Sequence, residues 1–296
     1  MGHPIYASAR IGVAVLAAAI MAGGVASPAR AQAVEAPAVW QYREDPESCR
    51  ASIAFGEGAD RVQLRLRSFG PGSPIEVLVA SAALPNEPRS AREVRLSWDG
   101  EMRDMLQVGI LGMTDTQVPT ITFQFVTRPT SAFFEGRVVN NMFYTSPPDV
   151  NAQTMALRVP GVAPISMSMG SLREPLAQLE QCESALLEKW GFGADYVHRI
   201  GRPPEIERRN DVDNIIFYPA AQLLNRIGTF VQLRLKVDAS GKVTDCVVQA
   251  PSGPTLFGAE SCKALKRSLR MTPAEDRQGR KVESFAQIAI AFARYD

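Results

Sequence analysis

The side chains that could carry chemistry in this chain are few, and its four cysteines are the most informative. Cys49, Cys182, Cys246 and Cys262 form no C-x-x-C pair, which argues against a zinc site or a thioredoxin-type redox pair. An even number of cysteines in an exported chain favours disulfides, because the periplasm oxidises thiols. Four cysteines allow three pairings, and we favour the two bonds that each lie within one domain.

Catalytic constellations are missing from the sequence. The chain has two histidines, and only His198 follows the N-terminal apolar segment. A Ser or Cys nucleophile needs a base beside it, and no H-E-x-x-H, G-x-S-x-G, phosphate-loop or dinucleotide pattern is present. A lone histidine in a connecting stretch is more often solvated than catalytic. We therefore expect no enzyme, no catalytic residue, no metal site and no cofactor.

The N-terminus has the pattern of a signal peptide. Arg10 supplies a short positive region, the apolar run Ile11–Val25 follows, and small-x-small patterns occur at Ala29–Ala31 and Ala31–Ala33. The run is about 15 residues, shorter than the roughly 20 that a spanning helix needs. We expect residues 1–33 to be cleaved and the mature protein to be periplasmic. The alternative is an uncleaved anchor that holds the protein on the periplasmic side of the inner membrane.

Residues 34–190 are expected to form a β-rich periplasmic domain of short strands. Apolar and polar residues alternate in Val62–Leu66, Val94–Trp98 and Ile121–Phe125, the period-two pattern of a half-buried strand. Further strand candidates are Ile75–Ala80, Met105–Met113, Gly136–Phe143, Thr154–Val159 and Ile165–Met169. Many short strands at this spacing predict an antiparallel sandwich or a barrel-like sheet.

A helix from about Leu172 to Lys189 is expected to close this domain. One stripe of the helix carries Leu176, Leu179, Cys182 and Leu186. Cys182 therefore points at the core, and Cys49 lies near the first strand of the same domain. A Cys49–Cys182 bond would join the two ends of the domain, with a stabilisation of about 4 to 5 kcal/mol in the chain-entropy account.

Residues 191–211 have the composition of a linker, with glycines, the pair Pro203-Pro204 and a charged run. The segment 212–296 then shows a helix, two strands, a helix and a strand. Its elements are a short helix after Tyr218-Pro219, strands at Val231–Val237 and Val243–Gln249, a helix at about Leu256–Leu269 and a last strand at Val282–Ala293. The expected fold class is α+β: a mostly antiparallel β domain closed by a helix, then a small α-β-β-α-β domain.

Short motifs in this last segment resemble the TonB C-terminal domain family. They are Tyr218-Pro219, Val237-Asp238-Ala239-Ser240-Gly241-Lys242-Val243, Pro251-Ser252-Gly253, and Met271-Thr272-Pro273-Ala274 followed by Gly279. The fragments stand in the family's order and near its spacing, and they cover roughly Val212 to Asp296. The resemblance implies a helix packed on a three-stranded antiparallel sheet.

A second disulfide fits this picture. Cys246 shares a strand face with Val248, and Cys262 shares a helix face with Leu265. If the strand and the helix pack there, the two thiols meet in the core and close a loop, worth about 3 kcal/mol in the loop-entropy account. The alternative is two buried free cysteines, which are common core residues.

The resemblance also implies a partner-binding edge. Family members pair a sheet edge with a short receptor peptide, the TonB box, by β-augmentation. The candidate here is the last strand, which has no proline and whose second face carries small alanines that would leave the backbone accessible. The predicted edge residues are Ser284, Phe285, Ala286, Gln287, Ile288, Ala289 and Ile290. The alternative is that this edge is covered or idle.

Energy transducers of the family have an uncleaved N-terminal helix and a Pro-rich spacer, whereas here a strand-rich domain stands in the spacer's place. We therefore expect a periplasmic TonB-family-like protein that interacts with envelope partners, by strand pairing with a TonB-dependent outer-membrane receptor in transmembrane transport. The alternative is a stand-alone sensor or structural binding module without energy transduction. The formal net charge of +1 and the scattered basic residues argue against a nucleic-acid groove.

The processing of the N-terminus provides a first prediction. We expect the protein recovered from the periplasm to begin near Ala31 or Ala33, because small residues there fit a signal-peptidase site. Intact-mass spectrometry of the natively expressed protein measures this directly. A species that keeps residues 1–30 and fractionates with the inner membrane would instead establish the anchored form.

Overall fold

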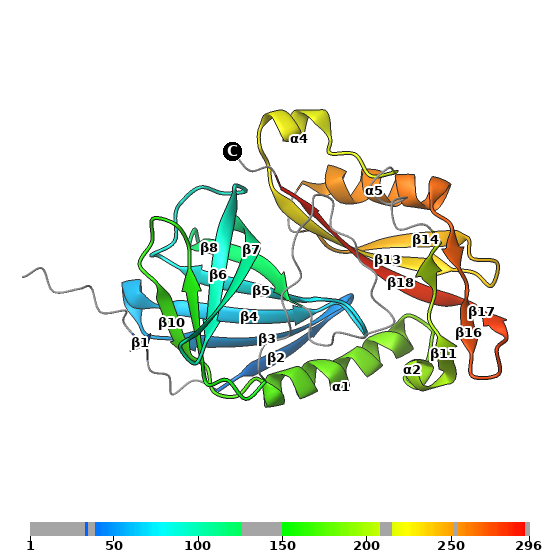
Figure 1. Cartoon of the computed structure of the whole chain (residues 1–296), viewed down its shortest axis with the longest axis horizontal. Coiled ribbons are helices and arrows are strands. Elements are labelled where there is room, and N and C mark those ends of the chain that lie inside the picture. The colour runs from blue at the N-terminus through cyan, green and yellow to red at the C-terminus, as the bar shows by residue number, and fades with distance from the viewer. Residues whose placement is uncertain (1–32, 35–38, 126–149, 208–214, 252–253, 294–296) are drawn as a thin grey trace, which may run out of the picture. The chain divides into compact units, whose positions relative to one another are not determined.

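The computed structural model describes residues 33–34, 39–125, 150–207, 215–251 and 254–293. The expected signal peptide and the strand candidate at 136–143 lie outside these residues. Residues Ala31–Asp296 form one compact unit. The described part has the α+β organisation that the sequence predicts, a large sheet with one long helix followed by a smaller helix-and-sheet region (Figure 1).

The large sheet has ten strands in the order β1-β10-β9-β6-β7-β8-β5-β4-β3-β2. Every neighbouring pair is antiparallel except β1 with β10, which is parallel. The strands are β1 Ala33–Val34, β2 Gln41–Asp45, β3 Ser48–Phe55, β4 Val62–Ser68, β5 Ile75–Ser81, β6 Ala91–Trp98, β7 Glu101–Met113, β8 Pro119–Phe125, β9 Thr154–Arg158 and β10 Ile165–Ser168, with a short 3-10 helix at Gly58–Asp60.

Alternation along the strands builds one core for this sheet. In β4, Val62, Leu64 and Leu66 are buried and Gln63 is exposed, as the period-two pattern predicts. Residues from β3 to β10 join a single hydrophobic cluster, in which Trp98 meets Phe125 edge-to-face at 6.4 Å. One continuous sheet around one core fits the barrel-like alternative better than a sandwich of two sheets.

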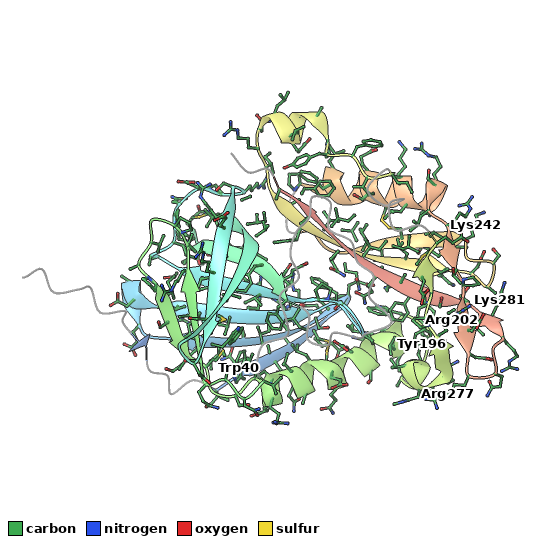
Figure 2. The ribbon with its side chains drawn as sticks, in the orientation of Figure 1. Trp40, Tyr196, Arg202, Lys242, Arg277 and Lys281 are labelled. Carbon is green, nitrogen blue, oxygen red and sulfur yellow. A yellow bond between two sulfur atoms is a disulfide. The ribbon has the colours of Figure 1, made fainter. Side chains whose placement is uncertain are left out.

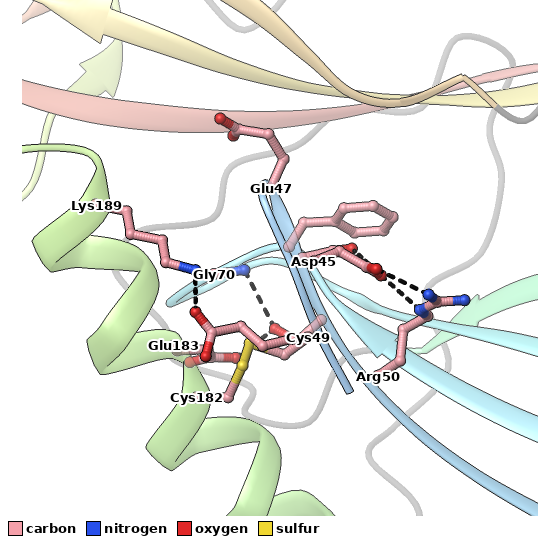
Figure 3. The surroundings of a disulfide bond; sticks show 12 residues. Asp45, Glu47, Cys49, Arg50, Gly70, Cys182, Glu183 and Lys189 are labelled. Atoms are coloured by element: carbon pink, nitrogen blue, oxygen red, sulfur yellow. Dashed lines mark hydrogen bonds and ion pairs between the residues drawn. A yellow bond between two sulfur atoms is a disulfide. The ribbon is translucent and has the colours of Figure 1, made fainter. Parts of the chain in front are cut away.

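Helix α1, Arg173–Lys189, closes this region as predicted. Leu179 and Leu186 are almost fully buried, and Leu176 and Cys182 pack against the same cluster. The structure contains the Cys49–Cys182 disulfide, which joins β3 to α1 with a Cα–Cα distance of 6.0 Å (Figure 3). The helix is therefore fastened to the sheet by a covalent bond as well as by its apolar stripe.

The C-terminal region is a three-stranded antiparallel sheet with one helix packed on it. The sheet has the order β14-β13-β18, and helix α5 contacts β14 and β13. Its elements are α4 Ala220–Leu224, β13 Thr229–Val237, β14 Val243–Pro251, α5 Thr255–Ser268 and β18 Ser284–Phe292. The Cys246–Cys262 disulfide joins β14 to α5 with a Cα–Cα distance of 5.5 Å. This is the helix-on-sheet arrangement that the resemblance implies.

The stretch expected to be a connector carries regular structure that the sequence does not predict. Residues 191–207 contain α2 Tyr196–Arg199, β11 Ile200–Arg202 and β12 Glu205–Ile206. Strand β11 pairs with β16 Ala274–Asp276, which pairs with β17 Lys281–Val282, and β12 pairs with β15 Met271–Thr272. The single last strand expected at Val282–Ala293 is instead β17 and β18, because the chain changes sheets at Glu283.

The turn between β13 and β14 depends on Gly241. This residue has φ +84°, and a Cβ built on it would lie 1.8 Å from the backbone oxygen of Met271. The carboxylate of Asp238 accepts hydrogen bonds from the backbone N–H groups of Ser240 and Lys242 at 2.8 and 3.0 Å. The hydrogen bond from the Ser240 hydroxyl, together with these two backbone bonds, lowers the pKa of Asp238. The turn is thus specified by a glycine and an aspartate of the family-like motif.

Substitution of Gly241 tests this close approach. Gly241→Ala should destabilise the protein by more than about 3 kcal/mol, because left-handed strain adds to a backbone clash. Gly279→Ala is the matched control, since Gly279 has φ +77° with no atom within 4 Å of its built Cβ. The control should cost only about 1 to 2 kcal/mol. Urea unfolding measures both, and equal losses would refute the role of the Met271 contact.

Candidate functional site

All seven predicted edge residues lie in β18, at one margin of the C-terminal sheet. Nine residue pairs, from Thr229–Phe292 to Val237–Ser284, join β18 to β13 in continuous antiparallel register. Among the described residues no strand pairs with the other side of β18. The strand is therefore an edge by its hydrogen-bond topology, which is the property that β-augmentation requires.

The residues of β18 are nonetheless buried. None of the nine is more than 5% exposed, and those values include the backbone. Ala289 and Ala291, which we expected to leave the backbone accessible, are each 1% exposed. A partner strand could not reach this edge without displacing what covers it. The burial has a clear cause on each face of the sheet.

The first face of β18 packs against helix α5 and against Tyr218, which precedes helix α4. Ala286, Ile288, Ile290 and Phe292 join the cluster that includes Phe257 and Leu265 of helix α5. The ring of Phe292 lies 4.6 Å from that of Phe257 and 5.4 Å from that of Tyr218, measured between centroids. This is the internal core of the small domain, and it would persist with any partner.

The second face of β18 meets residues that precede helix α2. The side-chain amide of Gln287 donates to the backbone oxygen of Phe69 at 2.6 Å, and the amide of Gln249 donates to the same oxygen at 2.8 Å. The side-chain amide of Gln232 extends this hydrogen-bond network by donating to Gln287 Oε1 at 3.1 Å. The amide nitrogens of all three glutamines thus have acceptors on this face or in the β4–β5 turn, whereas the buried Oε1 atoms of Gln232 and Gln249 have no hydrogen-bond partner among the described residues.

The β4–β5 turn fits closely at this point because of Gly70. Its φ is +116°, and a Cβ built there would lie 2.5 Å from the Trp190 ring and 2.6 Å from the Gln287 amide. No larger residue would fit without separating the turn from β18. The sequence shows Gly70 only as part of a turn signal, because its neighbours in space are more than 100 residues away in the chain.

An aromatic cluster holds the start of β18. The ring of Phe285 lies between 5.1 and 5.5 Å from those of Trp190, Phe192 and Tyr196, measured between centroids. Tyr196 is almost fully buried, and burial raises its pKa to about 12, so its hydroxyl stays protonated at physiological pH. The segment after helix α1 is thus packed on the same strand as the β4–β5 turn.

An ion pair joins the middle of the C-terminal sheet to the β2–β3 hairpin. Arg234 of β13 makes a bidentate contact with Glu47, with N–O distances of 2.9 to 3.2 Å, and its guanidinium lies 4.4 Å from the centroid of the Trp190 ring. The side chains of Arg234 and Glu47 are 12% and 25% exposed. A partly buried, two-pronged pair of this kind is stronger than an exposed ion pair. Sequence reasoning missed it, since the partners are 187 residues apart.

The far end of β18 makes an apolar contact with the large sheet. Ala291, Ala293 and Phe230 cluster with Ala91 and Ile110. Close by, the backbone N–H of Gly228 donates to the backbone oxygen of Arg89 at 2.5 Å. The second face of β18 therefore contacts the N-terminal region, here defined as residues 39–192, at its start, its middle and its end, through Phe285, Gln287 and Ala291.

The opposite edge of the C-terminal sheet is more open. In β14, Thr244 and Asp245 are exposed, and residues 246–248 are half-buried. The pairing of β14 with β13 is interrupted by two register shifts, between Gln232 and Leu233 and between Lys236 and Val237. Bulges and a charged side chain are the devices that protect an edge against pairing. The exposed edge, β14, is thus protected against pairing by its bulges and charge, whereas the regular edge, β18, is buried.

The groups that could support other chemistry are limited in the part of the chain that the structure describes. His198 is exposed on α2. Within the described ranges no group of three His, Cys, Asp or Glu side chains is placed to hold a metal ion. Over the same residues, no helix combines the length and apolar character that a membrane crossing needs.

Comparison with known families identifies the C-terminal region. Residues 216–293 match the family described as Gram-negative bacterial TonB protein C-terminal, so this segment of the chain is a TonB C-terminal domain. The family is non-catalytic, its domains act in the periplasm, and they interact with TonB-dependent outer-membrane receptors. No curated protein and no solved structure was found to match the chain.

A double-mutant cycle tests the Arg234–Glu47 pair. We expect a coupling free energy of about 1 to 2 kcal/mol between Arg234→Ala and Glu47→Ala, because the contact is bidentate and partly buried. Arg234→Lys should lose most of it, since an ammonium can neither form the two-pronged contact nor stack on Trp190. Urea unfolding of the four proteins gives the value. A coupling below about 0.3 kcal/mol would mean a screened surface contact.

Proposed function

We propose that this protein is a periplasmic interaction protein that pairs the edge of β18 with an extended segment of an outer-membrane transporter. The observation that supports this most directly is the regular nine-residue pairing of β18 with β13, with the other side of β18 free of any strand among the described residues. The family match to residues 216–293 supports a receptor as the partner. Unpaired backbone groups on such an edge can accept another strand.

Because β18 is buried, a partner strand can bind only after the strand has been exposed. The N-terminal region has to move off the second face before the edge can be reached, so only a fraction of molecules is competent at any time. The apparent dissociation constant is the intrinsic one divided by that fraction. The contacts at the centre of this covering interface are polar, namely the Gln287 and Gln249 amides on Phe69 and the Arg234–Glu47 pair, and those at its two ends are apolar. Polar interfaces within a chain are the kind that separate.

Energy transduction is not part of the proposal. A strand-rich region with its own core and disulfide precedes the TonB C-terminal domain here. Such a region suits a cover or a sensor better than a spacer that transmits force. The two disulfides fit an oxidising compartment, which supports the periplasmic assignment.

A second candidate function is a stand-alone sensor or structural module that binds no receptor. The burial of all nine β18 residues favours it, because a permanently covered edge has no partner to accept. The two candidates predict different peptide affinities when the packing of the N-terminal region on β18 is weakened. One experiment therefore separates them.

The experiment is a calorimetric titration of the full chain with an extended peptide of about eight residues that carries a receptor's TonB box. Glu47→Ala should tighten the apparent affinity about fivefold or more, because it weakens the cover and raises the competent fraction. Glu44→Ala is the matched control: it removes the same charge from the same hairpin but breaks only the exposed contact with Lys189. Its affinity should equal that of the unmodified protein.

A peptide with proline at alternate positions serves as the ligand control, because it cannot complete the hydrogen-bond ladder. It should bind none of the proteins. Equal binding of the two peptides would exclude strand pairing as the mode. Absence of binding to the Glu47→Ala protein would favour the stand-alone module.

A further inference from the structure

A cavity of about 460 Å³ lies between helix α2 and the β16–β17 hairpin. Phe192, Tyr196, His198 and Arg199 line it from one side, and Arg277 and Val282 from the other. This volume falls within the range of sites for small molecules. It is formed by two segments that the sequence shows only as a connector and a loop, and strand pairing at β18 makes no use of it.

The floor of the cavity is aromatic. Phe192 is half-buried, and Tyr196 beneath it is almost fully buried, with the two ring centroids 5.1 Å apart. Phe285 packs behind both rings at about the same distance, so the floor is fixed from below. A rigid aromatic surface at the base of a hollow accepts a flat or branched apolar group.

The charges at the rim are mostly neutralised. Arg280 pairs with Asp276 at 2.7 Å, Arg199 with Asp195 at 3.0 Å, and Glu283 with Lys236 at 2.9 Å. Among the polar lining residues that the structure describes, Arg277 and His198 are the two whose side chains have no hydrogen-bond or ion-pair partner. Arg277 is exposed at the turn of the hairpin, at the same end of the structure as Tyr196 (Figure 2).

We propose that this cavity binds a small organic carboxylate that carries an aromatic or branched apolar group. The guanidinium of Arg277 would bind the carboxylate, since its planar fork matches the two oxygens, and the apolar group would rest on Phe192, whose ring is packed on Tyr196. The carboxylates of Asp276 and Glu283 on the wall are already paired with Arg280 and Lys236, so Arg277 is the lining cation left to bind an anion. A singly charged anion with an apolar body is the chemistry that fits both features.

Nuclear magnetic resonance titration of the full chain tests the proposal with three probes. The first probe, N-acetyl-L-phenylalanine, carries both the carboxylate and the ring. The second, N-acetyl-L-phenylalanine amide, has the ring but no negative charge, and the third, N-acetylglycine, has the carboxylate but no ring. We expect saturable shifts for the first probe in residues 191–200 and 276–283. The other two should bind about tenfold more weakly, because each lacks one of the two contacts.

Protein variants locate the site. Arg277→Ala should weaken binding of N-acetyl-L-phenylalanine about fivefold or more, and Arg277→Lys should recover part of the loss. Arg202→Ala is the matched control, since Arg202 lies on the adjacent strand β11, pairs with Glu275 and does not line the cavity. Its binding should be unchanged.

Four results would overturn the proposal. These are no saturable shift up to about 10 mM probe, equal binding of the amide, equal binding of N-acetylglycine, and equal losses in the Arg277 and Arg202 variants. Arg277 is exposed at a hairpin turn, so its truncation should leave the thermal midpoint within about 2 °C, which the same samples can verify. The outcome does not depend on strand pairing at β18.

Discussion

The pairing of β18 with β13 is the interaction on which the rest of the C-terminal region depends. It places nine residues at the margin of a three-stranded sheet and gives each face of β18 a different neighbour. One face is the apolar core beneath helix α5, with Ile288, Ile290 and Phe292. The other face carries Phe285, Gln287 and Ala291, which meet the N-terminal region. A three-stranded sheet with one helix would otherwise leave that second face to solvent.

The contacts on the second face set the balance between a closed form, in which the N-terminal region packs on β18, and an open form, in which it has moved away. The centre of this face is polar: the Phe69 backbone oxygen receives two amides, and Arg234 meets Glu47. Its two ends are apolar, at the aromatic cluster of Phe285 and at Ala291. Hydrogen bonds lost on opening can be replaced by water, so a polar centre costs less to separate than an apolar one of equal area. The apolar ends keep the closed form dominant.

Much of the fold is predictable from the sequence because periodicity is local. The alternation in Val62–Leu66 and Val231–Val237 predicts strands that the structure contains, and the stripe through Leu179, Cys182 and Leu186 predicts helix α1. The helical cysteines of both disulfides, Cys182 and Cys262, lie on apolar stripes of the same kind, and each helix packs the cysteine toward a strand. The order of the motifs from Tyr218 to Gly279 predicts the TonB C-terminal domain, which the family match confirms.

The environment of the site could not be predicted in the same way. Polar residues on alternate positions of a strand indicate a face in water, and Gln232 and Gln287 follow that rule in the sequence. In the structure both are 2% exposed, because Gln287 donates to the Phe69 oxygen of the N-terminal region and accepts from Gln232. The strands β11 and β12 have two or three residues, too few to show a period. The contact of Arg234 with Glu47 spans 187 residues and leaves no local pattern.

Amide hydrogen exchange with and without the TonB-box peptide tests the central claim most directly. The account predicts that the peptide, added to the Glu47→Ala protein, protects amides of residues 284–292 while those of the other edge, 243–249, are unchanged. The first set includes the backbone groups of β18 that an added strand would engage, and the second lies on the bulged and charged edge. Protection of residues 243–249 instead, or of neither set at saturating peptide, would contradict the account.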